Sequence, residues 1–141
     1  MTPISVQLRE AVVRRAENRC EYCHLSADSQ DATFPVDHIQ SISLSGLTEF
    51  DNLALACPRC NAKKWKHVEA KDPMTGRLTL LFNPRIHVWS EHFCWSEADQ
   101  TLIEPISAIG RTTLDFLDLN SAKHLTIRSL LKLLDLHPPI E

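Results

Sequence analysis

The stretch that decides the fold is residues 36–64, VDHIQSISLSGLTEFDNLALACPRCNAKK. It opens with an acidic residue followed by an imidazole, Asp37-His38, and it ends with a C-x-x-C pair followed by lysines. A second C-x-x-C pair precedes it in the chain. Two dithiol pairs that bracket one Asp-His pair predict a metal-bound scaffold built around a second, catalytic metal site.

The length and composition of the chain predict a single domain over residues 1–141. Within it we expect a metal-bound core at about 18–70 and a C-terminal extension at about 71–141. The formal net charge is -3, so a nucleic-acid partner would have to be met by a local basic patch. No signal peptide or membrane-spanning apolar run is visible, which predicts a cytoplasmic protein with reduced thiols and no membrane partner.

Hydrophobic periodicity and turn signals predict an α+β fold: a small ββα-metal core stapled by a four-cysteine zinc site, with additional short strands and C-terminal helices. Helices are expected at residues 5–18, from residue 61 to the Asp-Pro at 72–73, at 107–118, and after residue 121. Strands are expected at residues 34–39, 77–82, 87–89, 92–95 and 101–106. Residues 41–51 read as a loop, and 53–56 as a short apolar run.

The two C-x-x-C pairs predict a structural zinc site with four thiolate ligands: Cys20, Cys23, Cys57 and Cys60. A redox pair and unpaired buried thiols are the alternatives, but a redox pair usually lies near a βαβ pattern, and two such pairs here would be redundant. Four thiolates fill the coordination sphere, so this zinc is expected to tie the first helix to the segment after Leu55 and to perform no chemistry. The fifth cysteine, Cys94, is expected to be a buried or half-buried strand residue.

Asp37-His38, then Asn52, then Asn61 beside the second cysteine pair, then Lys64, resemble the motif of the HNH endonucleases. These are the ββα-metal nucleases, and the resemblance is to the branch with two zinc knuckles. It covers about Cys20 to Lys64. Further stretches at 81–85, 89–93 and 109–111 look like an extension found in one bacterial branch of that family.

The resemblance implies catalytic roles for four residues: Asp37, His38, Asn52 and Asn61. His38 would be the general base, because the pKa of an imidazole lies near the working pH. Asp37 and Asn61 would hold a catalytic Mg²⁺ or Mn²⁺, which prefer hard oxygen ligands. Asn52 would brace the loop between the two strands.

Each of these roles has a structural alternative. His38 could be a solvated or core histidine, Asn52 an Asx-turn residue, and Asn61 a helix N-cap. Neighbouring strand residues point to opposite faces, so Asp37 and His38 serve one site only if the strand twists or ends there. We expect it to end at Ile39.

Four residues next to this motif are predicted to bind nucleic acid: Arg59, Lys63, Lys64 and Lys66. Cations of this kind pair with phosphates, whereas the alternative is an ordinary solvated helix face. Trp65 lies among them, and we expect a core position for it rather than a base-stacking platform.

Three hypotheses follow for the function. The first is a metal-dependent endonuclease that hydrolyses DNA, most simply double-stranded DNA. The second is a zinc-stapled nucleic-acid-binding module without catalysis, and the third is a component that cuts only within a larger complex. If the two metal sites are assigned correctly, Cys57→Ser should unfold the protein and Asp37→Ala should leave it folded and inactive.

Overall fold

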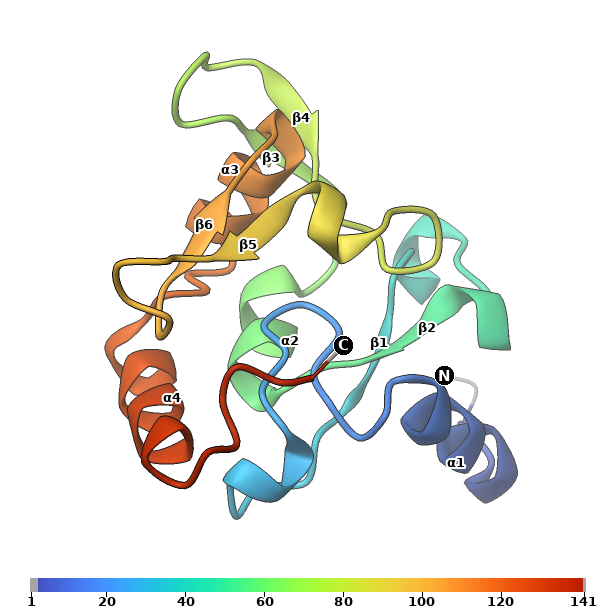
Figure 1. Cartoon of the computed structure of the whole chain (residues 1–141). Coiled ribbons are helices and arrows are strands. Elements are labelled where there is room, and N and C mark those ends of the chain that lie inside the picture. The colour runs from blue at the N-terminus through green and yellow to red at the C-terminus, as the bar shows by residue number, and fades with distance from the viewer. Residues whose placement is uncertain (1–2, 141) are drawn as a thin grey trace. The chain divides into compact units, whose positions relative to one another are not determined.

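The computed structural model describes residues 3–140, which form an α+β fold of short elements (Figure 1). The helices are α1 Val6–Arg15, α2 Pro58–Lys64, α3 Ala108–Phe116 and α4 Ala122–Leu133. The strands are β1 Val36–His38, β2 Leu53–Leu55, β3 Glu69–Lys71, β4 Leu78–Leu80, β5 Phe93–Trp95 and β6 Ile103–Pro105. The strands pair antiparallel as β1–β2, β3–β4 and β5–β6, so the predicted α+β class is confirmed.

The described residues separate into two compact units. The first contains the chain up to Val68 together with Asn83–Ile86, and the second contains Glu69–Phe82 and the chain from His87 onward. The change of unit after Val68 lies close to the predicted boundary at residue 70. The organisation of the whole chain as a single domain remains a prediction.

In the first unit, α1 begins where the sequence predicts and ends three residues earlier. The Ser5 side chain caps the helix by accepting a hydrogen bond of 3.1 Å from the backbone of Leu8. Glu17 and Asn18 have φ values of 54° and 59°, which interrupt the helical backbone. The chain therefore leaves α1 in a tight reversal that leads directly to Cys20.

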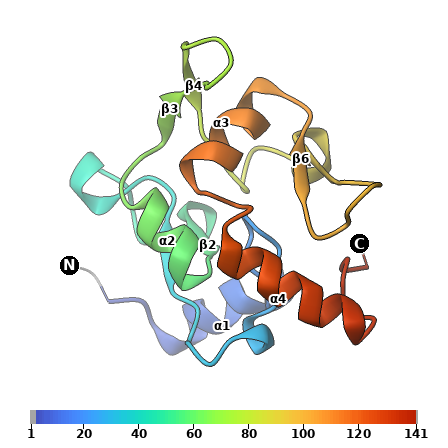
Figure 2. The ribbon, with the colours of Figure 1, turned by 90° about the vertical axis from the view of Figure 1, so that its left-hand side faces the viewer.

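The centre of the first unit is a ββα arrangement. Strands β1 and β2 pair with His38 opposite Leu53, and every residue of β2 is buried. Helix α2 follows directly, with Cys57 as its N-cap and Pro58 in its first turn. Both ribbon views show α2 beside this strand pair (Figures 1 and 2).

The predicted extent of the second helix is wrong. Helix α2 ends at Lys64, whereas the sequence predicts a helix as far as residue 72. Trp65 has a φ of 45°, which no helical residue adopts, and residues 69–71 form strand β3 instead. Pairing with β4 satisfies the backbone of β3, an option that the helix-compatible side chains of this segment do not reveal.

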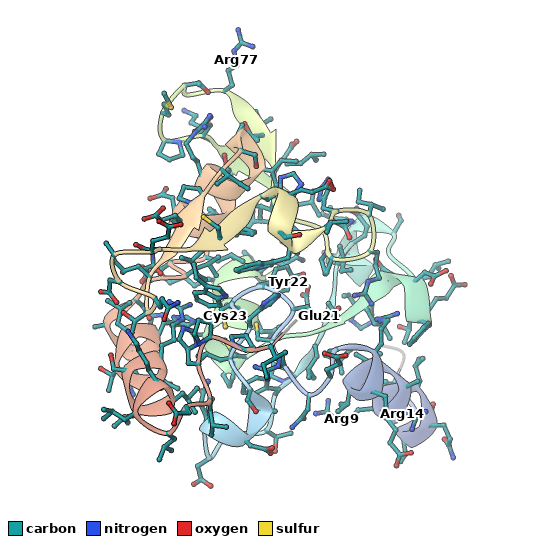
Figure 3. All side chains as sticks on the ribbon, in the orientation of Figure 1. Arg9, Arg14, Glu21, Tyr22, Cys23 and Arg77 are labelled. Atoms are coloured by element: carbon teal, nitrogen blue, oxygen red, sulfur yellow. The ribbon has the colours of Figure 1, made fainter. Side chains whose placement is uncertain are left out.

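In the second unit, a β3–β4 hairpin packs against α3, which also contacts β6. The hairpin turn follows Lys71, and Gly76 adopts a φ of 73° within it. Figure 3 shows Arg77 projecting from the end of this hairpin. The buried Arg128 of α4 donates hydrogen bonds to the carbonyl oxygens of Thr101 and Leu119.

Two further predictions for the second unit have different outcomes. The predicted starts of the last two helices are confirmed, since α3 and α4 follow Ser107 and Ser121, whose side chains accept a hydrogen bond from the first turn of their helices. The strand predicted at residues 87–89 is wrong, because this segment is a bend that leads into a 3-10 helix at Trp89–Glu91. In the described part of the chain, no helix has the length and apolar character needed to cross a bilayer.

Candidate functional site

The four predicted zinc ligands lie together in the first unit: Cys20, Cys23, Cys57 and Cys60. Their sulfur atoms lie within 4.8 Å of one another, and all four side chains are buried. A tetrahedron with zinc–sulfur bonds of about 2.3 Å has edges of about 3.8 Å. The distance of 3.7 Å between the sulfurs of Cys23 and Cys57 matches such an edge. The predicted clustering of these cysteines is therefore confirmed.

The backbone around the cysteines also suits a zinc site. The amides of Cys23 and Cys60 each donate a hydrogen bond of 3.4 Å to the sulfur of the first cysteine in their own pair. Hydrogen bonds from the thiols of Cys20, Cys23 and Cys60 lower the pKa of the Cys57 thiol. Four convergent sulfurs form the donor set of a closed structural zinc site. Cys94 lies elsewhere, half-buried in β5, as the sequence predicts.

Asp37 is buried in the centre of β1, where its side chain is 4% exposed. The hydroxyl of Tyr22 donates a hydrogen bond of 2.8 Å to its Oδ2 atom, and the Lys64 ammonium lies 3.1 Å from the same oxygen. Burial raises the pKa of Asp37, although the Lys64 charge and the Tyr22 hydrogen bond act in the opposite direction. Figure 3 shows Tyr22 beside Cys23 on the loop after α1. This loop therefore contributes to the cysteine cluster and also carries a residue that contacts Asp37.

Lys64 is 1% exposed and lies inside the unit rather than on its basic surface. Its ammonium contacts the Asp37 carboxylate and donates hydrogen bonds to the carbonyl oxygens of His38, at 3.4 Å, and Ile39, at 2.9 Å. An ammonium has three donors, and these contacts occupy all three. The prediction that Lys64 binds phosphate therefore needs revision. Lys64 instead links the end of β1 to α2.

Asn61 lies on α2 one turn before Lys64. Residues three apart on a helix share a face, so Asn61 lies on the face that Lys64 turns towards Asp37. Asn61 is not the helix N-cap, because that position belongs to Cys57. That Asp37 and Asn61 hold one ion remains a prediction, which the helical spacing of Asn61 and Lys64 supports.

His38 is the last residue of β1, one residue before the predicted strand end. Its Nε2 atom and the hydroxyl of Thr48 lie 3.0 Å apart. Asp37 faces Tyr22 and Lys64, whereas the His38 ring faces the loop between β1 and β2. Either atom of this pair can donate, depending on the tautomer of the ring, and Nδ1 can accept a proton in the tautomer in which Nε2 donates to Thr48.

Asn52 braces the loop between β1 and β2. Its amide nitrogen donates to the carbonyl oxygens of Gln40 and Leu47, and its side-chain oxygen accepts a hydrogen bond from the backbone of Gln40. These partners lie up to twelve residues back in the chain, so the contacts are not those of a local Asx turn. The loop that carries Thr48 is therefore fixed at both ends.

Sequence analysis missed several residues that build this site. Arg85 returns to the first unit and donates a hydrogen bond of 3.2 Å to the carbonyl oxygen of Leu53, and it forms an ion pair with Glu21. Glu21 in turn accepts a hydrogen bond of 2.8 Å from the backbone of Leu55. Arg85 belongs to the stretch 81–85 noted above, but neither spacing nor periodicity indicates its partners. Tyr22 and Thr48 were missed for the same reason.

The remaining predicted nucleic-acid ligands are exposed, namely Arg59, Lys63 and Lys66. The core position predicted for Trp65 is wrong, because its side chain is 64% exposed. The helix ends just before this residue, so the ring does not follow the buried face of α2. The ammonium of Lys66 lies 4.5 Å from the centre of the indole.

Comparisons with known proteins match the segment that carries this site to a family model. Residues 20–67 match the family described as HNH endonuclease, which confirms the resemblance found from the sequence. The chain is also 26% identical over 120 residues to the Septu protein PtuB of Bacillus thuringiensis. That alignment covers 84% of this chain and 43% of the relative, so the chain spans less than half of that relative's length. No solved structure matches the chain.

Proposed function

Because residues 20–67 match the HNH endonuclease family, we propose that this chain is a metal-dependent endonuclease that hydrolyses phosphodiester bonds in DNA. The observation that carries the proposal is the contact between Lys64 and Asp37. This contact holds α2, and with it Asn61, beside the strand end where His38 lies. For this chemistry, His38, Asp37 and Asn61 must reach one bound phosphate, with the His38 ring on the side of the β1–β2 loop and Asp37 on the side of Tyr22 and Lys64.

In this proposal His38 takes the proton from the attacking water through Nδ1. This role assigns the ring proton to Nε2, which would donate it to the Thr48 hydroxyl and leave the lone pair of the neutral imidazole on Nδ1. The fixed ends of the loop hold Thr48, so they also hold the orientation of the ring. A general base placed in this way typically accelerates a reaction by about 10²–10⁴-fold.

Asp37 and Asn61 would hold the catalytic ion. The donor set fits Mg²⁺ or Mn²⁺, because both residues offer hard oxygen atoms, and because Asp37 Oδ1 has only a long contact of 3.5 Å with Lys64. When bound, a divalent ion neutralises charge on the phosphate and on the departing 3′ oxygen. Tyr22 and Lys64 orient the Asp37 carboxylate through their contacts with its other oxygen, Oδ2.

The exposed cations Arg59, Lys63 and Lys66 would contact phosphates on either side of the scissile bond. Their contribution is independent of base sequence and falls as salt rises. Double-stranded DNA is the substrate expected from the sequence. The name of the relative, Septu protein PtuB, adds no substrate to this proposal.

A plasmid assay tests the proposal. Zinc-loaded protein and its His38→Ala variant are incubated with supercoiled plasmid in Mg²⁺ or Mn²⁺. We expect the parent to nick or linearise the plasmid and the variant to be slower by at least about 10²-fold. His24→Asn is the matched control, because asparagine tolerates the φ of 65° at that position.

The assay also separates the proposal from its main alternative. If the parent binds the plasmid but does not cut it under any of these conditions, the chain is a non-catalytic binding module. Equal cutting by the parent and His38→Ala would remove His38 from the mechanism.

A further inference from the structure

We infer that Trp65 is a stacking platform for one unstacked base of the strand that the site cuts, so that the preferred substrate carries an unpaired base near the scissile phosphate. The inference deepens the proposed function and rests on it for the identity of the cut strand. Its physical basis is the exposure of the indole, its backbone conformation, its charged neighbours and its attachment to the site.

The exposure of Trp65 is unusual for a tryptophan in this chain. Its side chain is 64% exposed, whereas Trp89 is 8% exposed and Trp95 is half-buried. Tryptophan offers the largest apolar face of all side chains, and on average it is highly buried. An indole that a fold leaves in water is therefore available to a ligand with a flat aromatic surface.

The backbone of Trp65 is also unfavourable for this residue. The amide of His67 donates a hydrogen bond of 2.9 Å to the carbonyl oxygen of Lys64, which closes a turn with Trp65 in its second position. The φ and ψ values of Trp65 are 45° and -120°, which suit glycine and are rare for a bulky side chain. Strain of this kind persists mainly at binding and catalytic sites.

The charges around the indole fit a polyanion. The Lys66 ammonium lies 4.5 Å from the ring centre, and Arg59 and Lys63 are exposed on the preceding helix. Proteins that bind single strands combine such cations, which pair with phosphates, with aromatic rings on which bases stack. The combination favours a nucleic-acid strand over an apolar protein surface, since a protein surface would leave these cations without counter-charges.

The position of Trp65 connects the platform to the catalytic residues. Its amide donates a hydrogen bond of 3.0 Å to the carbonyl oxygen of Asn61, and it directly follows Lys64, which contacts Asp37. A base on the indole would therefore lie close to the phosphate that the site holds. In a fully paired duplex the bases remain stacked on each other, so this contact needs an unpaired base.

A binding experiment tests the inference. Zinc-loaded full-length protein carrying His38→Ala, which prevents cutting, is titrated against two labelled DNA hairpins by fluorescence anisotropy. One hairpin is fully paired and the other carries one unpaired adenine. We expect Trp65→Gly to weaken binding of the second hairpin by about 5- to 150-fold and to leave the first nearly unchanged.

Two further variants separate stacking from charge and from folding. Lys66→Ala should weaken both hairpins equally and lower the salt dependence of binding. Trp65→Phe should retain most of the preference, because phenylalanine also stacks. Trp65→Gly should keep or raise the Tm, since glycine adopts the φ of 45° without strain. In the His38→Ala protein, quenching of tryptophan fluorescence by the unpaired hairpin should disappear with Trp65→Phe.

The outcomes are distinct from those of the plasmid assay. Equal loss for both hairpins, no loss with Trp65→Gly, or a change of oligomeric state with no change in DNA binding would overturn the inference. Cutting of plasmid together with any of these results would leave the proposed function intact. A preference for the unpaired hairpin in a parent protein that cannot cut would instead support the platform and remove the endonuclease.

Discussion

The four-cysteine cluster and the site around Asp37 and His38 share helix α2, yet they differ in almost every physical respect. The cluster uses four buried sulfurs within 4.8 Å of one another. The candidate second site would use an imidazole, a carboxylate and an amide; His38 and Asn61 are half-buried, whereas Asp37 is buried. Four thiolates would fill the coordination sphere of a bound zinc ion, whereas a catalytic ion would need positions for water and substrate.

The shared helix explains why both sites depend on one geometry. Cys57 and Cys60 fix the start of α2, and Asn61 and Lys64 follow in its next turn. The cysteine cluster therefore fixes the position of α2. The ion pair between Lys64 and Asp37 then holds α2 against β1. We therefore expect loss of the cysteine cluster to affect stability, and changes at His38 to affect the proposed activity.

The largest expected effect is loss of the closed site. Zinc binding contributes about 10–16 kcal/mol in small zinc domains, which exceeds the stability of many whole domains. Cys57→Ser should therefore unfold the first unit and lose zinc, as measured by circular dichroism and metal analysis. The control is Cys94→Ser, which should remain folded with its zinc. A Cys57→Ser protein with the parental Tm and zinc content would contradict the assignment.

The next effect is on the ion pair that joins the two sites. The sequence predicts that Asp37→Ala stays folded and inactive, but the structure shows that this change leaves the Lys64 ammonium buried without its counter-charge. We expect a loss of about 3–5 kcal/mol in the free energy of unfolding, measured in urea. The double variant Asp37→Ala/Lys64→Met should recover part of it. Additive losses would show that the pair does not link the sites.

A smaller effect is expected at the general base. Thr48→Val removes the hydroxyl that lies 3.0 Å from His38 Nε2, while it keeps the shape of the side chain. The cutting rate should fall by about two- to tenfold, because the ring loses one orienting hydrogen bond. Thr48→Ser should restore the rate. An unchanged cutting rate in Thr48→Val would show that the hydroxyl has no role in holding the ring.

The smallest effect concerns an ion pair that lies outside both sites. It serves as a reference for the ion pair between Asp37 and Lys64. In the second unit, the Arg111 guanidinium lies 2.9 Å from Asp72, and its hydrogen bonds lower the pKa of that carboxyl to about 2. A lowered pKa means stabilisation that is present above about pH 4 and is lost as the pH falls towards 2. Asp72→Asn should therefore lower the Tm at pH 7 and have little effect near pH 2. The same Tm difference at both pH values would contradict this.

The sequence predicts the local parts of the site well. Cysteine spacing predicts which sulfurs converge, because two intervening residues let both thiols of a pair face one ion. The starts of α1, α3 and α4 are also predicted, since a helix start that is capped by serine depends on residues within one turn. The end of α2 was mispredicted, because the residues after Lys64 favour a helix while their strand pairing lies in the following segment.

By itself, the sequence indicated the α+β class, the four thiols that cluster and the resemblance that the match of residues 20–67 bears out, because each depends on patterns along the chain. Only the tertiary structure decided that Lys64 is buried against Asp37 and that Trp65 is exposed. It also decided that Thr48 contacts His38 and that Arg85 contacts Glu21. These contacts join residues that are distant in sequence. The packing of strands and helices determines which residues meet, and no local sequence pattern indicates that packing.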